Sequence, residues 1–371
     1  MKGMQKRKEV KRVLVIGPSE TRSCGGMAQV IRGIRESAYL SKEFKLDSFP
    51  SYIDGSLPVR LLYSAYAYIH FLFRVNNYDL FHIHVAERGS TFRKNLYLKT
   101  AKRAGKKVII HIHGAEYLAF YDGLGRWGKR VVYHFFHQAD RVLVLSKIWK
   151  KELEARIPME SYKILHNGID TACFASAASS VEEYQHSFFM LGRLGKRKGV
   201  YDLIDAVELA VQVNPKIKLC LAGDGEIGKV RELIAQKGLG KHIALTGWIS
   251  GEEKLRRLKH AATLVLPSYD EGLPIAILEG MAAGKAILST TVGAIPEVVG
   301  RENGILVTPG DIPALTEGLL RCSSDTAMLK QMSKKNREKA RGYFDIRQMH
   351  EQLAEYYREA AGVFPVKKGE N

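Results

Sequence analysis

The sequence predicts an α/β protein of two similar domains, each built on a doubly wound parallel sheet. Its 371 residues are too many for one ordinary α/β domain and suit two. Short β-type runs alternate with helical runs, and the alternation starts again near the middle of the chain, which implies right-handed βαβ units in both halves. Ligands of such sheets bind at the carboxyl ends of the strands, so we expect a site in a central cleft that the two domains face.

Six strands are expected in the first half. They are residues 13–17, 45–49, 79–85, 108–113, 142–146 and 163–166. Helical segments are expected between them at 26–37, 91–104 and 128–139. The small and polar stretch 175–185 is the expected linker, which places the domains at 1–178 and 179–345.

The same pattern returns in the second half. Its expected strands are residues 187–192, 217–222, 243–247, 263–267, 286–289 and 304–307. Helices are expected at 201–213 and 273–283. A final helix at 346–360 has no obvious place in the second domain.

The longest apolar stretch, Leu61 to Val75, is interrupted by His70 and Arg74. It is shorter than the roughly 20 residues that a membrane-spanning helix needs. Two interpretations stay open, a buried helix and a helix in a membrane interface. The second is favoured by its aromatic residues Tyr63, Tyr66, Tyr68 and Phe71.

The net charge of +18 is concentrated in the first half of the chain. Residues 1–178 carry 30 Lys/Arg and 15 Asp/Glu, a balance of +15, and the remainder carries 27 and 24, a balance of +3. Such asymmetry indicates an anionic partner: anionic lipid, a lipid-linked pyrophosphate or nucleic acid. A merely solvated basic face is the alternative.

The cysteines argue against a zinc site and a disulfide framework, because they lie far apart without a CxxC pair. They are Cys24, Cys173, Cys220 and Cys322. This pattern fits a reducing cytoplasm. The charged N-terminus, with Lys6, Arg7 and Lys8, runs directly into a strand and lacks the pattern of a signal peptide.

The motif with the strongest chemical content runs from Glu271 to Glu279, after the strand at 263–267. If a helix begins near Leu273, Pro274 lies in its first turn, where a missing N–H costs nothing. The free amides of that helix start can receive an anion or a hydroxyl. The segment therefore offers two separated carboxylates, as the hexose and the ribose of a nucleotide sugar require. A helix cap or salt bridge by Glu279 is the alternative.

Two cations follow the first strand of the second half. Arg193 lies at the strand end and Lys198 precedes a helix, so both are expected at the ligand edge of the sheet. A diphosphate leaving group needs such neutralisation, with a bidentate fork from arginine and a point charge from lysine. A solvated basic turn is the alternative.

Two further turns lie at strand ends in the first half. Cys24-Gly25-Gly26 opens a helix, and its paired glycines let backbone amides close on a phosphate, although a plain tight turn explains them equally well. In His111-Ile112-His113-Gly114, alternation places the two histidines on the same side of a strand. They lack a third metal ligand nearby, and the strand-end position favours a ligand-facing His113 over a core histidine.

Together these segments resemble the GT4 family, the large family of retaining glycosyltransferases with two Rossmann-like domains (the GT-B fold), over nearly the whole chain. The matching parts are Ser268-x-x-Glu271-Gly-Leu-Pro followed by Glu279, Gly192-Arg193 to Lys198-Gly199, His111-x-His113-Gly114, Gly25-Gly26 and Asn167-Gly168-Ile169-Asp170. The resemblance implies that residues 1–178 bind the acceptor and residues 179–345 the nucleotide sugar. It also implies that a C-terminal helix, residues 346–362, packs back on the first domain.

The resemblance also implies roles for single residues. Glu271 would hold the hydroxyls of the donor sugar and Glu279 the ribose, while Arg193 and Lys198 would bind the diphosphate. The donor-binding segment would further include Gly25, Gly26, Gly272, Leu273 and Pro274. His113 would face the sugar and the acceptor, so the expected catalytic residues are His113, Glu271, Arg193 and Lys198.

The reaction that the resemblance implies is transfer of a hexosyl group with retention, by same-face substitution through an oxocarbenium-like state. Glu271 as a nucleophile is the minority view. No metal or other cofactor is expected, because no DxD-type motif stands beside a strand end. A UDP-sugar is favoured over a GDP-sugar by how common uracil is in such enzymes.

The stretch from 79 to 114 resembles bacterial exopolysaccharide or capsule members that use a lipid-linked acceptor. We therefore expect a cytoplasmic enzyme, peripheral at the inner face of the cell membrane, with an anionic membrane surface as partner. No nucleic-acid partner is expected, because no RNA- or DNA-binding signature accompanies the charge. A sugar-nucleotide 2-epimerase of similar build and a non-catalytic scaffold of a polysaccharide assembly complex are the alternatives.

Overall fold

The computed structural model describes residues 10–23 and 25–362, and these divide into two compact units. Among the described residues, the first comprises 10–23 and 25–166 with 347–362, and the second comprises 167–346. Cys24 and the basic residues 6–8 lie outside the described part of the chain.

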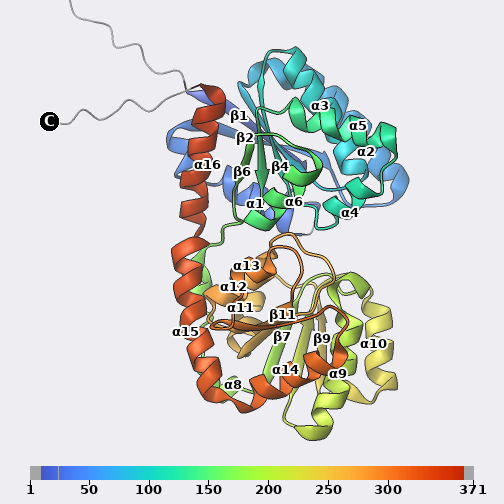
Figure 1. Ribbon diagram of the computed structural model, residues 1–371, viewed down its shortest axis with the longest axis vertical. Helices are drawn as coiled ribbons and strands as arrows, with labels where there is room; N and C mark the ends of the chain where they lie inside the picture. Colours follow the sequence, from blue (N-terminus) through green and yellow to red (C-terminus); the bar gives the residue numbers. More distant parts are fainter. Residues whose placement is uncertain (1–9, 24, 363–371) are drawn as a thin grey trace, which may run out of the picture. The chain divides into compact units, whose positions relative to one another are not determined.

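The first unit contains a six-stranded parallel sheet in the order β2-β1-β3-β4-β5-β6 (Figure 1). Its strands are β1 (Lys11–Pro18), β2 (Phe44–Tyr52), β3 (Leu80–Val85), β4 (Lys107–Ile112), β5 (Arg141–Val144) and β6 (Tyr162–Ile164). Its helices are α1 (Gly26–Arg35), α2 (Leu57–Arg74), α3 (Gly89–Arg103), α4 (Tyr117–Asp122), α5 (Arg126–His137), α6 (Lys147–Arg156) and α16 (Ile346–Ala361). Short 3₁₀ turns are η1 (Leu40–Lys42) and η2 (Val75–Asn77).

The second unit repeats this architecture with the strand order β12-β11-β10-β7-β8-β9. Its strands are β7 (Ser187–Leu191), β8 (Lys218–Ala222), β9 (Ile243–Gly247), β10 (Thr263–Leu266), β11 (Ala286–Thr290) and β12 (Gly304–Val307). Its helices are α7 (Thr171–Ala175), α8 (Val181–Tyr184), α9 (Val200–Val213), α10 (Ile227–Gln236), α11 (Gly251–Lys259), α12 (Ile275–Ala282), α13 (Ile295–Val298), α14 (Ile312–Ser324) and α15 (Thr326–Tyr343). The 3₁₀ turns are η3 (Lys196–Lys198) and η4 (Leu239–Lys241).

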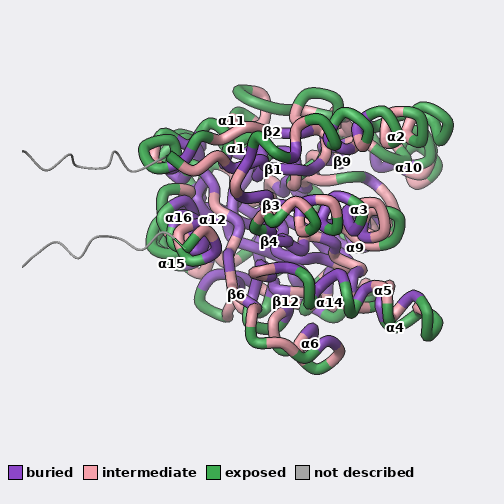
Figure 2. Tube along the Cα trace, turned by 90° about the horizontal axis from the view of Figure 1, so that it is seen from above, coloured by how far each residue is buried: buried purple, intermediate pink, exposed green. Residues whose placement is uncertain are grey.

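The sequence-based fold class is confirmed. All twelve strands lie where the alternation of apolar runs predicts them, each within a few residues. Helices cover both faces of each sheet, so the central strands β3, β10 and β11 are buried along their whole length (Figure 2). In β11, for example, every residue is buried.

The units meet earlier in the chain than the sequence suggests. We expected the boundary at 178, but it falls between His166 and Asn167. The reason is packing, because Asn167 donates to the Leu273 carbonyl at 2.8 Å and Ile169 pairs with Asp345. The expected linker at 175–185 includes the short helix α8, so it is only partly irregular.

Helix α16 packs on the first unit. Its Tyr357 hydroxyl lies 2.8 Å from Nδ1 of His82 on β3, and its His350 Nδ1 lies 2.8 Å from the Ser37 hydroxyl. Tyr357 also meets Phe44 edge to face with ring centroids 5.3 Å apart. Through these contacts α16 belongs to the first unit, although it follows the second unit in the sequence.

Helix α2 is not buried, so the first of the two interpretations of this segment is wrong. Only Ala67 and Phe71 are buried along its 18 residues. Large apolar side chains point to solvent, with Leu62 73% and Phe73 81% exposed. No helix in the described ranges is both long enough and apolar enough to cross a membrane.

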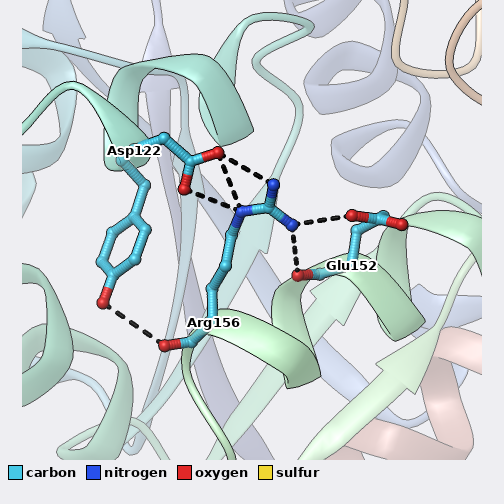
Figure 3. A network of polar contacts seen from close by, with 4 residues as sticks. Asp122, Glu152 and Arg156 are labelled. Carbon is cyan, nitrogen blue, oxygen red and sulfur yellow. Dashed lines mark hydrogen bonds and ion pairs between the residues drawn. The ribbon is translucent and has the colours of Figure 1, made fainter.

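A cluster of charged side chains fixes α4, the helix that follows the His113-Gly114 turn (Figure 3). Arg156 on α6 donates to Asp122 through Nε and Nη2, at 2.9 and 2.8 Å, and to Glu152 through Nη1 at 2.7 Å. The Tyr121 hydroxyl donates to the Arg156 carbonyl at 3.3 Å. The bidentate geometry holds the end of α4 against α6.

Candidate active site

The loop after β10 carries Glu271 at the carboxyl edge of the second sheet. Its side chain is 6% exposed, forms an ion pair with Lys198 and accepts a hydrogen bond from the Ser268 hydroxyl at 2.7 Å. β7 and β10 are neighbouring strands, which brings the loop of Lys198 beside the loop of Glu271. The structure therefore joins two residues that the sequence analysis placed in separate motifs.

Two glycines let these loops pack against each other. Gly199 has φ +68°, and a Cβ there would come within 2.0 Å of the Pro267 carbonyl oxygen. Gly293, with φ +56°, lies equally close to Glu271, where a Cβ would come within 1.9 Å of its carbonyl oxygen. Both positions require glycine, because a side chain would be strained and would overlap the backbone.

The helix after Glu271 begins later than expected. α12 starts at Ile275 with Pro274 as its N-cap, so Pro274 is not inside the first turn. Gly272 and Leu273 are buried in the preceding turn, where their carbonyls accept from Ala294 N at 2.9 Å and from Asn167 Nδ2 at 2.8 Å. The backbone beside Glu271 is thus held from two sides.

Glu279 lies buried inside α12 and forms a second ion pair with a half-buried lysine. Its Oε1 is 2.5 Å from Nζ of Lys254 on α11, and that ammonium group lies 5.0 Å from the centroid of the Phe174 ring. Burial raises the pKa of Glu279, and Lys254 acts in the opposite direction. The structure shows the salt bridge that the sequence analysis weighed as an alternative, but with a lysine on another helix.

Arg193 differs from these paired groups. It follows β7, is exposed, and has no hydrogen-bond or ion-pair partner among the described residues. The next residue is fixed, because the Leu194 amide donates to the Asp224 carbonyl at 2.6 Å. The guanidinium therefore extends from an anchored loop at the ligand edge and is free to bind an anion.

In the first unit, Gly25 and Gly26 open α1 after β1. Gly25 is the N-cap with φ +142° and has no side-chain cap, and both glycines are exposed. The first turn contains no acidic residue, so its amides are open to an anion. A cavity of about 240 Å³ is lined by residues of β1, β2, α1 and the turn after β1, and neither glycine lines it.

His113 belongs to an array of four histidines: His82 and His84 lie on β3, His111 lies on β4, and His113 directly follows β4. Register pairs His84 with His111. His84 Nδ1 lies 2.8 Å from His113 Nε2, and His82 Nε2 lies 3.3 Å from His111 Nδ1. His82, His84 and His111 are fully buried, and His113 is only partly buried. Burial lowers the pKa of His82 and of His113 to about 3 and lowers those of His84 and His111 well below the usual range.

The sequence analysis considered a metal pair at His111 and His113 and found no third ligand. The structure assembles a different trio, because His82, His84 and His111 offer nitrogen atoms within 4.8 Å of one another. Hydrogen bonds to Tyr357 and His111 occupy both nitrogens of His82. Metal independence stays a prediction.

Sequence reasoning missed Lys254, Gly293 and the two histidines of β3. The two histidines could have been predicted from the sequence, since His82-x-His84 repeats the alternation of His111-x-His113 on the neighbouring strand. Lys254 carries no such signal, because it is one of several charged residues on α11.

The two parallel-sheet units have the architecture of the GT-B fold. Solved structures share the fold: the HepE protein of Anabaena in complex with UDP and glucose has a TM-score of 0.74 at 18% identity, covering 94% of this chain and 99% of that one. Sucrose-phosphate synthase from Thermosynechococcus elongatus has a TM-score of 0.76 at 19% identity, covering 95% and 100%.

The chain belongs to the GT4-type glycosyltransferases. Residues 36–172 match Glycosyltransferase Family 4, and residues 175–339 match the Glycosyl transferases group 1 family. It is 27% identical over 286 residues to an amylovoran biosynthesis glycosyltransferase of Erwinia amylovora, covering 75% of this chain and 69% of that one. It is 24% identical to the Escherichia coli UDP-Gal:alpha-D-GlcNAc-diphosphoundecaprenol alpha-1,3-galactosyltransferase, covering 77% and 76%.

Proposed function

We propose that this glycosyltransferase moves a hexosyl group from a nucleoside-diphosphate sugar to a saccharide acceptor, with retention and without a metal ion. The observation that carries the proposal is the cluster at the ends of β7 and β10. It combines Arg193, which is unpaired among the described residues, with the ion pair of half-buried Lys198 and buried Glu271. A leaving diphosphate needs two positive groups, and a hexose needs a carboxylate that accepts from its hydroxyls.

In the proposed reaction, the bond between the anomeric carbon and the diphosphate oxygen breaks through an oxocarbenium-like state. The acceptor hydroxyl forms the new C–O bond on the same face, and its proton goes to the departing diphosphate. Arg193 and Lys198 stabilise the charge that develops on that diphosphate. Glu271, fixed by Ser268, orients the hexose and stays bonded to Lys198.

The remaining site residues follow from the family resemblance. Glu279 binds the ribose, which requires its carboxylate to share Lys254 with a hydroxyl group. The amides at Gly25 and Gly26 assist with the diphosphate, and His113 contacts the sugar and the acceptor. We favour UDP as the nucleotide, in line with the UDP complexes of HepE and the UDP-sugar named for the E. coli relative.

We further propose a lipid-linked acceptor in the synthesis of a cell-surface polysaccharide, at the cytoplasmic face of the membrane. The names of the relatives from E. amylovora and E. coli support this, since one acts in amylovoran synthesis and the other on a diphosphoundecaprenol acceptor. A sugar-nucleotide 2-epimerase and a non-catalytic scaffold fit less well. Neither explains the acceptor named for the E. coli relative.

The surface of α2 supports contact with a membrane. Leu62, Tyr66, Ile69 and Phe73 are exposed at spacings of four, three and four residues, so they form one apolar stripe. α3 and α5 lie in the same helical layer, where Trp127 is 75% exposed and its ring stacks 6.4 Å from Phe92 (Figure 1). Exposed apolar surface beside aromatic and basic residues is typical of interfacial helices.

The proposal is tested first by thermal shift with UDP, GDP and their sugars, and then by transfer from the stabilising nucleotide sugar to a diphosphate-linked lipid saccharide. We expect UDP compounds to raise Tm and the product to keep the anomeric configuration of the donor. Inversion of configuration would refute retention. Conversion of the donor to its C2 epimer without an acceptor would favour the epimerase.

A further inference from the structure

The hydrogen bond between His84 and His113 raises the question of which ring carries the proton. His84 Nδ1 lies 2.8 Å from His113 Nε2, and one of these nitrogens must donate. Each neutral imidazole has one N–H donor and one acceptor nitrogen. The choice at this bond therefore fixes the tautomers of both rings.

The second nitrogen of His84 distinguishes the two arrangements. His84 Nε2 is buried and has no hydrogen-bond partner in the part of the chain that the structure describes. If His113 Nε2 donates, the proton of His84 must lie on this Nε2, which leaves a buried N–H without an acceptor. If His84 Nδ1 donates, Nε2 keeps only a bare lone pair. Buried donors without a partner are the rarer and less favourable defect, so the second arrangement is preferred.

The same choice determines what His113 presents. His113 is half-buried, and no described residue bonds its Nδ1. That atom is absent from the buried unpaired nitrogens, so it reaches solvent beyond the carboxyl end of β4. When His84 donates to His113 Nε2, the proton of His113 must lie on Nδ1.

We propose that His84 is a positioning residue that holds His113 in the Nδ1–H tautomer, so that His113 offers the substrate a hydrogen-bond donor and not a base. The ligand class is an oxygen acceptor, such as a sugar hydroxyl or ring oxygen. This use of the tautomer rests on the proposed glycosyl transfer, whereas the tautomer itself follows from the geometry of the array.

The proposal agrees with the reaction scheme above. His113 Nε2 is occupied by the bond to His84, and its Nδ1 already carries a proton, so neither nitrogen is free to remove the acceptor proton. That proton then goes to the departing diphosphate, as the same-face reaction requires. His84 fits the task because register on β3 and β4 brings its ring against His113, with centroids 4.9 Å apart.

The direct test is NMR of the full-length protein with ¹⁵N-labelled histidine. Two-bond ¹⁵N–¹H correlations distinguish the tautomers, and the signal of His113 is assigned by its loss in H113Q. We expect a neutral His113 with the proton on Nδ1. A proton on Nε2, or equal populations, would overturn the proposal whether or not sugar transfer is observed.

Three variants test the role of His84. H84L removes the donor, and we expect mixed tautomers at His113 with kcat lowered at least about tenfold and KM for the nucleotide sugar changed less. H84N returns an amide N–H near the position of Nδ1 and should restore both the tautomer and most of kcat. H82L, on the same strand and equally buried, loses the bonds to Tyr357 and His111 but should keep the tautomer and kcat within about threefold of wild type.

These outcomes separate the two claims. Retention of the wild-type tautomer in H84L, or equal kcat losses in H84L and H82L, would refute a positioning role for His84. An Nδ1–H signal in a protein that transfers no sugar from any nucleotide would instead refute the proposed function and leave the tautomer assignment in place.

Discussion

Glu271 and Arg193 lie at the ends of neighbouring strands in opposite surroundings, which makes them informative to mutate. Glu271 is buried and paired with Lys198, and Arg193 is exposed and unpaired among the described residues. We expect Glu271→Gln and Arg193→Ala each to lower transfer at least about tenfold, because each removes a contact that strengthens in the transition state. Steady-state kinetics with the nucleotide sugar measures the loss.

Lys196→Ala is the matched control for Arg193, since Lys196 is an exposed cation on the same loop. It should keep wild-type kinetics, and circular dichroism should show an intact fold in all three variants. Wild-type turnover in either site variant would remove that residue from the proposed site.

The Lys254–Glu279 pair allows a prediction about stability. Lys254→Met leaves the Glu279 carboxylate buried without its cation, which typically costs about 3–5 kcal/mol. The double variant Lys254→Met/Glu279→Gln removes both charges and should recover most of that loss. Urea unfolding measures both, and equal losses in the single and double variants would contradict the assigned pairing.

We predict that transfer needs no metal ion, because Arg193 and Lys198 are assigned the neutralisation of the diphosphate. Transfer should persist in EDTA, and metal analysis of the purified protein should find no stoichiometric ion. Loss of activity that Mg²⁺ or Mn²⁺ restores would contradict the role of the two cations. Stoichiometric zinc would point to the trio His82, His84 and His111.

Which site residues the sequence predicts depends on what kind of contact they make. Glu271, Arg193 and Lys198 could be predicted from the sequence, because the carboxyl ends of strands in a parallel sheet lie at the same edge. Gly199 was read as part of a motif, but its close approach to Pro267 depends on neighbouring strands. Lys254 could not be predicted as the partner of Glu279, because no local sequence pattern indicates that α11 packs against α12.

At the scale of elements, β3 and β4 make the first unit sensitive to acid. The four histidines of the array have folded-state pKa values below the ordinary value of about 6.5, because burial disfavours their charged form. The unfolded chain therefore binds more protons than the folded one below that pH. Their stabilising contribution is complete above about pH 6.5 and is lost as pH falls toward the folded pKa, about 3 for His82 and His113.

We expect the free energy of unfolding to fall by up to about 1.4 kcal/mol per pH unit for each buried neutral histidine between pH 6.5 and pH 4.5. Urea unfolding at several pH values measures this slope. H82L should reduce the slope because it removes one proton-binding group from the unfolded state. A flat profile, or an unchanged slope in H82L, would show that the array does not control acid stability.

Element type was predictable throughout, and the surroundings of an element were not. The apolar run at α2 predicts a helix, but whether that helix is buried depends on how many other elements pack against it, which the run does not show. Only one stripe, with Ala67 and Phe71, meets the sheet layer. The start of α12 was also misjudged, because Pro274 suits the N-cap as well as the first turn.

At the scale of the whole molecule, the charge of +15 on residues 1–178 is not all available at the surface. Lys94 on α3 is buried and bonded to Ser51, and Lys102 pairs with Asp140, so these two are poor choices for testing surface charge. Exposed cations of the same helical layer are Lys99, Arg103, Arg126 and Arg130. The sequence showed the excess charge but not which side chains present it.

These cations and the apolar stripe of α2 should act together at a membrane. Basic residues near an anionic surface contribute about 1 kcal/mol each and are screened by salt, whereas apolar insertion is not. We therefore expect the enzyme to bind anionic vesicles in preference to neutral ones, and to lose most of this binding between low and high salt. Charge reversal at the four exposed cations should weaken binding mainly at low salt.

Leu62→Ser/Phe73→Ser should weaken vesicle binding at both salt concentrations, because each residue buries apolar surface in the headgroup region. Val213→Ser on α9 is the matched control, since Val213 is 71% exposed but lies in the second unit. Vesicle flotation measures binding, and the thermal shift with UDP should be unchanged in all variants. Equal binding to neutral vesicles, or equal effects of the α2 and α9 variants, would contradict a membrane-facing first unit and leave the basic charge to a soluble acidic partner.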